Sequence, residues 1–451
     1  MPHARRTRRR RVRRLGAGCS LLLVALTLGG AAVAVAVTRA PRWLPSRQIS
    51  PGPLSRYTCG GALPAMNARG DTAVSFGCED KARGTGGSEV VLRPATGRFT
   101  APVSLDAPVA DVAIGDGGQV LGVGTRGDAI SPAPERVVAV AGSTRTQSFG
   151  APVTIGSPMS SDSDHSPRVA MNGHGDGVVA WVRQNPHGEG ILASIRRAGG
   201  RFGAPETIPG SSGRDPQVGM DARGDVTVAW LTRAGAVLAL DVAVRPAGGR
   251  FGAPTTVSRS TQDLAALDLA VSPTGEAVLA SLYGDGSIAV VLRGRHGGFG
   301  PPHTLAGPSN NYLVPVAAID ARGEAVVAWG RPYKSDVLAA VRRPGHGFGP
   351  ATILSRPGEP AGEPVLAGGG TGHFTVAWAT RTKSGLSYVV ARVKSAGKPF
   401  GAERRVTRFH GGGEGFAFGV TVDALGDALA VTGADGRVQA ADYDPGRRSA
   451  R

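Results

Sequence analysis

The sequence is poor in the residue types that build catalytic and metal centres. Its 451 residues include 3 cysteines and 9 histidines, and aromatic residues make up 5%. None of the cysteines or histidines forms the CxxC, HxH or HExxH spacing of redox and zinc sites. We therefore expect no cofactor and no metal site. Helical periodicity is also missing after residue 37, which excludes a repeat built from helix pairs.

A repeated sequence motif dominates the rest of the chain. In its clearest copy a turn glycine, Gly224, is followed by an acidic residue, a β-branched run and, six residues on, a tryptophan. The glycine recurs eight times, and four of the five tryptophans occupy the same slot: Trp181, Trp230, Trp329 and Trp378. The eight glycines are Gly70, Gly118, Gly175, Gly224, Gly275, Gly323, Gly372 and Gly426. Glycine supplies the positive φ of a tight turn, so we expect eight equivalent turns.

A phenylalanine-glycine motif marks the second half of each repeat. Its seven copies begin at Phe99, Phe149, Phe202, Phe251, Phe299, Phe348 and Phe400, 48 to 53 residues apart. Each period contains four strand-sized segments separated by Gly, Asp and Pro, which is typical of a propeller blade. The sequence thus predicts an all-β propeller of about eight four-stranded blades, with seven as the fallback, in one domain over residues 38–444.

The eighth repeat ends before its fourth strand. Residues 43–50 resemble the segment that begins at Phe348, so we predict that they supply the outer strand of the last blade. The alternative is a membrane-proximal linker, which Pro41, Pro45 and Pro51 would suit equally. Residues 445–451 form a basic tail.

The amino terminus has the charge pattern of an exported protein. Residues 1–14 contain eight arginines and no acid, and residues 15–37 are uncharged. Twenty-three residues at about 1.5 Å each give roughly 34 Å of helix, enough to cross a bilayer. We expect either a cleaved signal peptide or a single-pass anchor with its arginines inside, and a monomeric domain outside the cytoplasm.

Two cysteines lie outside this apolar segment. Cys59 and Cys78 are equidistant from the turn at 68–69, so a hairpin there would place them opposite each other. We predict a disulfide, which an oxidising compartment permits.

Basic residues also recur, six positions before most of the phenylalanines. Arg196, Arg245, Arg293 and Arg342 are candidate contacts for an anionic glycan or polymer. The alternative is that each arginine protects a blade edge from unwanted pairing. The formal charge of +17 falls to about half without residues 1–14, so nucleic acid is not an expected partner.

Two segments resemble known propeller repeats. Residues 199–205 and 248–254 look like the second half of the Asp box of sialidase-like propellers, and residues 272–280 look like the turn of TolB-type and WD40-like blades. Pro246 and Val244 stand where the Asp box has its aspartate and serine. The resemblance implies a propeller and nominates no catalytic residue. We expect a non-enzymatic extracytoplasmic binding or scaffolding module; the alternative is a glycoside hydrolase or lyase acting on extracellular glycans.

Overall fold

The computed structural model describes residues 40–446, with gaps at 128–134, 157–161, 187, 262–263, 296, 310–312, 332–335, 383–384 and 411–415. The predicted helix over residues 15–37 lies outside these residues. Within 40–446, no helix has the length and apolar character needed to cross a membrane.

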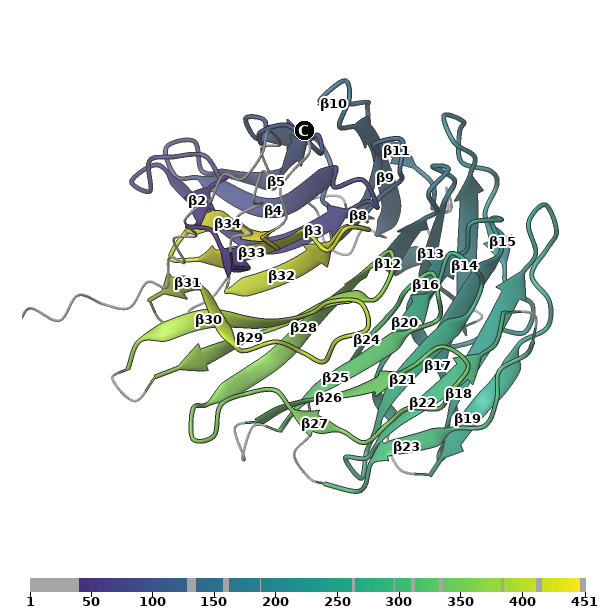
Figure 1. Cartoon of the computed structure of the whole chain (residues 1–451). Helices are drawn as coiled ribbons and strands as arrows, with labels where there is room; N and C mark the ends of the chain where they lie inside the picture. Colours follow the sequence, from purple (N-terminus) through teal and green to yellow (C-terminus); the bar gives the residue numbers. More distant parts are fainter. Residues whose placement is uncertain are drawn as a thin grey trace, which may run out of the picture. The chain divides into compact units, whose positions relative to one another are not determined.

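Eight antiparallel sheets confirm the predicted propeller. In blades 1 to 7 the chain runs from an innermost strand outward, and the first three strands pair in order; in blade 8 the outer strands come from the start of the domain. Figure 1 shows innermost strands such as β12, β16 and β20 gathered around the middle and fourth strands such as β15 and β19 at the periphery. Blades 1 to 4 comprise β3 (Tyr57–Met66), β4 (Thr72–Asp80), β5 (Thr85–Arg93) and β6 (Val103–Leu105); β7 (Asp111–Ile114), β8 (Gln119–Arg126), β9 (Arg136–Ser143), β10 (Ser148–Phe149) and β11 (Val153–Thr154); β12 (Ser163–Met171), β13 (Gly177–Asn185), β14 (Gly188–Arg196) and β15 (Glu206–Thr207); and β16 (Arg214–Met220), β17 (Val226–Ala234), β18 (Val237–Arg245) and β19 (Thr255–Ser260).

Blades 5 to 8 follow the same plan and complete the ring. The innermost strand of each blade packs against that of the next, and β32 of blade 8 packs against β3 of blade 1. Blades 5 to 8 comprise β20 (Leu264–Val271), β21 (Ala277–Tyr283), β22 (Ile288–Arg293) and β23 (His303–Ala306); β24 (Val316–Ile319), β25 (Ala325–Arg331), β26 (Asp336–Arg342) and β27 (Thr352–Ile353); β28 (Ala361–Gly369), β29 (His373–Arg381), β30 (Ser387–Lys394) and β31 (Arg404–Phe409); and β32 (Ala417–Val422), β33 (Ala428–Ala434) and β34 (Arg437–Asp444) with β1 (Arg42–Trp43) and β2 (Arg47–Gln48).

The start of the folded domain completes blade 8. Both β1 and β2 pair antiparallel with β34, with Trp43 opposite Tyr443 and Arg47 opposite Ala440. The backbone N–H of Ile49 donates to the carbonyl of Val438 at 2.9 Å, and the Ile49 side chain is buried. The two ends of the domain are therefore held in one sheet.

The turn glycines have the conformation that the repeat predicts. All eight have φ between +79° and +92°. In blade 4, the Asp221 carboxylate accepts the backbone N–H groups of Arg223 and Asp225 at 2.9 Å. The carboxylate of Asp225 in turn accepts the N–H of Ala247 at 2.8 Å, so the acid after the glycine caps the turn between the third and fourth strands.

Neighbouring turns are also bonded to one another. The N–H of Ala222 donates to the carbonyl of Pro273 at 3.0 Å, and the N–H of Ala424 donates to that of Ala68 at 3.1 Å. The second contact joins blade 8 to blade 1, so the turns connect across the closure of the ring.

The repeated aromatic residues form the core between blades. The tryptophan side chains are at most 1% exposed, and each packs against residues of the preceding blade, as Trp230 does against Val178 and Ile191. Of the phenylalanines, Phe251 is buried, and the others are partly buried at the edges of these clusters: Phe202, Phe299 and Phe348.

Candidate functional site

The innermost strands bring one residue of each blade to the axis at the same level. These residues stand seven positions before the turn glycines and are partly exposed, although they lie on the central strands of the domain. A closed ring of blades encloses a central channel, so accessible side chains on its innermost strands border that channel. The eight residues are Leu63, Asp111, Arg168, Gln217, Asp268, Val316, Val365 and Gly419.

Four consecutive blades supply the polar members of this level. We call Asp111, Arg168, Gln217 and Asp268 the axial polar arc; they come from β7, β12, β16 and β20. The other four blades supply apolar residues or glycine. Leu63 at this level and Val314 close by are 38% and 40% exposed, which is high for large apolar side chains of a domain interior. At this level the channel is therefore polar on one side and apolar on the other.

The two carboxylates of the axial polar arc hold the neighbouring strands. Asp111 accepts the backbone N–H of Val169 on the next blade at 2.9 Å. Asp268 accepts the N–H of Ala317 on its next blade at 2.7 Å. Burial raises the pKa of both aspartates, and the guanidinium of Arg168 acts in the opposite direction on both. Arg168 therefore lies within electrostatic range of blades 2 and 5.

The two remaining polar groups of the arc have hydrogen-bonding capacity to spare. Among the described residues, the guanidinium of Arg168 makes no hydrogen bond or ion pair, and the side-chain amide of Gln217 makes no hydrogen bond. A guanidinium carries five N–H donors and an amide two donors and an acceptor, so these groups remain available to a ligand.

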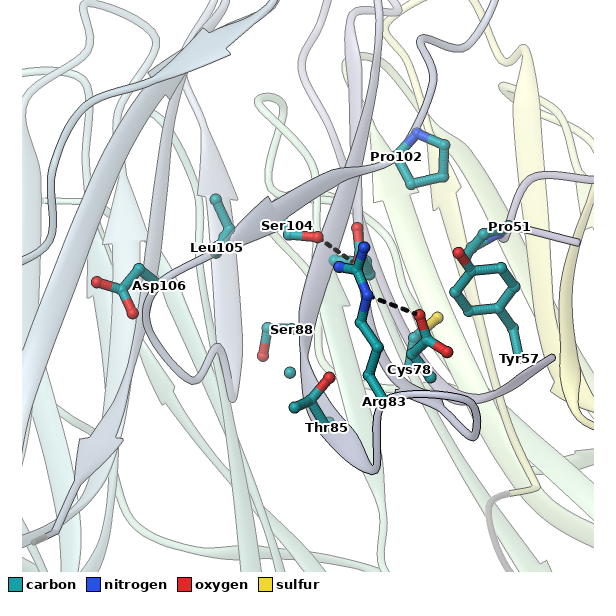
Figure 2. Close-up of a pocket in the computed structure, with 14 residues that line it drawn as sticks. Pro51, Tyr57, Cys78, Arg83, Thr85, Ser88, Pro102, Ser104, Leu105 and Asp106 are labelled. Atoms are coloured by element: carbon teal, nitrogen blue, oxygen red, sulfur yellow. Dashed lines mark hydrogen bonds and ion pairs between the residues drawn. The ribbon is translucent and has the colours of Figure 1, made fainter.

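A second concave surface lies on blade 1. It has a volume of about 530 Å³ and is lined by the β4–β5 hairpin, β6 and the segment that follows β2 (Figure 2). Its polar residues include Arg83, Glu89, Ser104 and Asp106. This cleft is separate from the axial polar arc, none of whose residues line it.

The arginines predicted to bind an anion lie in four different blades and mostly contact the protein. Arg342 donates to the carbonyls of Gly323 at 2.7 Å and His346 at 2.9 Å. Arg245 pairs with Glu206 of the preceding blade at 3.1 Å. Two others form backbone bridges with the phenylalanines six residues on: Arg196 with Phe202 and Arg293 with Phe299. Anion binding by this set stays a prediction.

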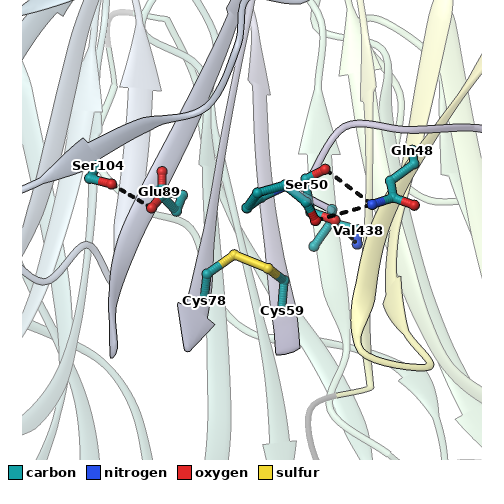
Figure 3. Close-up of a disulfide and its surroundings, with 8 residues drawn as sticks. Gln48, Ser50, Cys59, Cys78, Glu89, Ser104 and Val438 are labelled. Atoms are coloured by element: carbon teal, nitrogen blue, oxygen red, sulfur yellow. Dashed lines mark hydrogen bonds between the residues drawn. A yellow bond between two sulfur atoms is a disulfide. The ribbon is translucent and has the colours of Figure 1, made fainter. Parts of the chain in front are cut away.

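The predicted disulfide is confirmed. Cys59 and Cys78 face each other in the β3–β4 register and are bonded through their sulfur atoms (Figure 3). Cys78 also lines the blade 1 cleft, so the disulfide ties the cleft to the innermost strand.

Comparisons with known proteins support the fold. No protein-family model matches the chain, and no curated protein sequence matches it. Among solved structures, the BP39L lectin from Burkholderia pseudomallei has a TM-score of 0.50 at 14% identity, covering 77% of this chain and 99% of the lectin. The polysaccharide lyase PL25 ulvan lyase has a TM-score of 0.47 at 11% identity, covering 88% and 95%. The Hadza microbial sialidase Hz136 has a TM-score of 0.38 at 12% identity, covering 74% and 73%. The eight sheets described above make the chain a β-propeller, and these likenesses do not define the repeat type within that class.

Proposed function

We propose that this chain is a non-enzymatic binding module that acts outside the cytoplasm and holds an amine-bearing ligand at the axial polar arc. The observation that carries the proposal is the excess of acid in the arc: Asp111 and Asp268 share the field of a single guanidinium, that of Arg168, which has no hydrogen-bond partner among the described residues. Unpaired charge at an accessible position inside a rigid ring is a feature of binding sites rather than of cores.

Charge favours a cation over an anion at this site. Two carboxylates and one guanidinium leave the arc with a net charge of −1 when all are ionised. An anionic ligand would be attracted by one guanidinium and repelled by two carboxylates, whereas a protonated amine would be attracted by two carboxylates and repelled by one guanidinium. The apolar half of the channel, with Leu63 and Val314, provides a surface for the carbon skeleton of the ligand.

The location outside the cytoplasm rests on two features. The Cys59–Cys78 disulfide is of a kind that persists in oxidising compartments. The arginine-rich residues 1–14 followed by the uncharged residues 15–37 have the order of an export signal or an anchor. We propose that the propeller is secreted or held at the outer side of a membrane.

Two substitutions with opposite expected effects test the site. The full chain is purified in a detergent without a sugar head group, and binding of glucosamine and spermidine is measured by calorimetry, with glucose as the uncharged counterpart. Asp268→Asn should weaken amine binding about tenfold, because one attractive charge is lost. Arg168→Gln should strengthen it by a similar factor, because a repulsive charge is lost. Arg201→Gln, at an exposed turn, is the matched control.

If Asp268 and Arg168 only supported the fold, their substitutions would not change the affinity for amines in opposite directions. If neither amine binds the unmodified chain at millimolar concentration, or if both substitutions weaken binding equally, the proposal is wrong. Preserved thermal unfolding of each variant is checked in parallel.

A glycoside hydrolase or lyase remains the second candidate. The specific observation in its favour is a pair of carboxyl groups, Asp111 and Asp268, whose pKa burial raises, as a general acid requires. Against it, each carboxylate is already engaged by a backbone N–H of the adjacent blade. Release of reducing or unsaturated ends from polysaccharides, abolished by Asp268→Asn, would establish the enzyme and displace the binding module.

A further inference from the structure

The blade 1 cleft has a floor formed by one face of its sheet. Residues opposite each other in register share a face, and so do residues two apart on a strand. Asp80 is opposite Thr85, Cys78 is opposite Gly87, and Glu89 is opposite Ser104. All six line the cleft, so its floor runs from the hairpin end to β6 (Figure 2).

The closing segment of blade 8 provides one wall. Pro51, which follows β2, and Tyr57, at the start of β3, both line the cleft. The hydroxyl of Ser50 accepts the backbone N–H of Val438 at 3.0 Å, which holds this wall against β34 (Figure 3). Pro102, Leu105 and Asp106 line it from the side of β6. The cleft therefore lies where the first and last blades meet.

The polar groups of the cleft are preorganised. Glu89 accepts the hydroxyl of Ser104 at 2.5 Å, which leaves its other carboxylate oxygen and one of its lone pairs for a ligand. Asp80 is held by a pair of hydrogen bonds from Arg56, and these keep the pKa of Asp80 below its usual value. Arg83 extends from the hairpin into the middle of the cleft (Figure 2).

This mixture of donors and acceptors matches a ligand rich in hydroxyl groups. Glu89 and Asp106 accept hydrogen bonds, Arg83 donates them, and Thr85 can do both. A hydroxyl group both donates and accepts, so one ligand can satisfy all three kinds of partner. Tyr57 adds an aromatic surface, with Arg56 at 5.0 Å from its ring centre.

We infer that the blade 1 cleft is a second ligand site, which binds a short, uncharged saccharide. Its volume of about 530 Å³ falls within the range of small-molecule sites. Glu89 accepts sugar hydroxyls, Arg83 donates to sugar oxygens, and Tyr57 packs on a ring face. The inference does not depend on the axial polar arc, since the two sites share no residue.

A substitution that fills the cleft without disturbing the fold provides the test. Gly87 lies on the floor beside Glu89, and a Cβ atom added there meets no atom within 4 Å. Gly87→Leu should therefore fold normally and occupy the ligand volume. Gly294→Leu is the matched control, because a Cβ atom there also meets no atom within 4 Å and the site lies in blade 5.

The full chain, in a detergent without a sugar head group, is applied to a glycan array of neutral and charged oligosaccharides, and the strongest neutral binder is titrated by calorimetry. Gly87→Leu should abolish binding and Glu89→Gln should weaken it about tenfold or more, since a hydrogen bond to a charged acceptor is lost. Gly294→Leu and Arg168→Gln should leave it unchanged. The inference is overturned if no neutral glycan binds, if only charged glycans bind, or if Gly87→Leu binds like the unmodified chain. Loss of binding on Arg168→Gln with retention on Gly87→Leu would assign the saccharide to the axial polar arc instead.

Discussion

The four repeated tryptophans occupy one slot, yet their indole N–H groups differ. Nε1 of Trp181 donates to the buried carboxylate of Asp164 at 3.0 Å. Nε1 of Trp230 and that of Trp329 are buried and have no hydrogen-bond partner among the described residues. Replacing each tryptophan by phenylalanine removes similar packing but a different polar contact, so the comparison isolates the hydrogen bond.

The two substitutions should differ by about 2.5 to 6 kcal/mol in free energy of unfolding. Trp329→Phe loses about 1 kcal/mol of packing, but it also removes an unsatisfied buried donor, which is worth about 1 to 3 kcal/mol, so its net effect is small. Trp181→Phe loses the same packing and a hydrogen bond to a charged acceptor, about 1.5 to 3 kcal/mol. Arg183 still pairs with Asp164 at 2.8 Å, which limits the loss.

Urea unfolding followed by far-ultraviolet circular dichroism measures the difference without relying on tryptophan fluorescence. Trp230→Phe is the internal control and should behave like Trp329→Phe. Equal destabilisation of all three variants would show that the indole N–H contributes nothing, and a larger loss in Trp329→Phe than in Trp181→Phe would refute the reasoning.

Three further predictions concern the closure, the disulfide and the axial carboxylates. A chain that starts at residue 51 should melt at a lower temperature and be cleaved faster by protease than one that starts at residue 41, because β34 loses its outer partners β1 and β2. Identical melting and cleavage would contradict the closure. Cys59 and Cys78 should resist alkylation until reduced, and Cys59→Ser with Cys78→Ser should destabilise by about 3 kcal/mol, while labelling of the unreduced folded chain would count against the disulfide. Burial raises the pKa of Asp268 above its usual 3.8, so its contribution to stability is present when protonated and is lost as the pH rises through the folded-state pKa. The stability of Asp268→Asn relative to the unmodified chain should accordingly increase above about pH 4, and parallel pH profiles would disprove it.

The repeated residues predict the fold because each repeats for a physical reason that sequence alone reveals. A glycine at every turn indicates a left-handed backbone, and the φ values of Gly70 to Gly426 agree. The cysteines at 59 and 78 are equidistant from a turn, and the hairpin places them opposite each other. The sequence does not indicate that the acid after the glycine caps a turn, as Asp225 caps Ala247, because the partner lies 22 residues away.

The axial polar arc escapes the same reasoning because no residue type repeats there. Packing fills the buried tryptophan slot with a large aromatic residue in five of the eight blades, whereas a side chain that faces the channel differs from blade to blade, as Asp111, Arg168 and Gln217 do. A signal was nevertheless present: prolines that are buried in the structure precede four of the axial residues, at Pro167, Pro216, Pro315 and Pro364. In a propeller, a position that holds the same residue type in many blades is usually fixed by packing. A position that varies between a repeated proline and a repeated turn is therefore where a sequence indicates ligand chemistry, and here it points to Arg168 and Gln217.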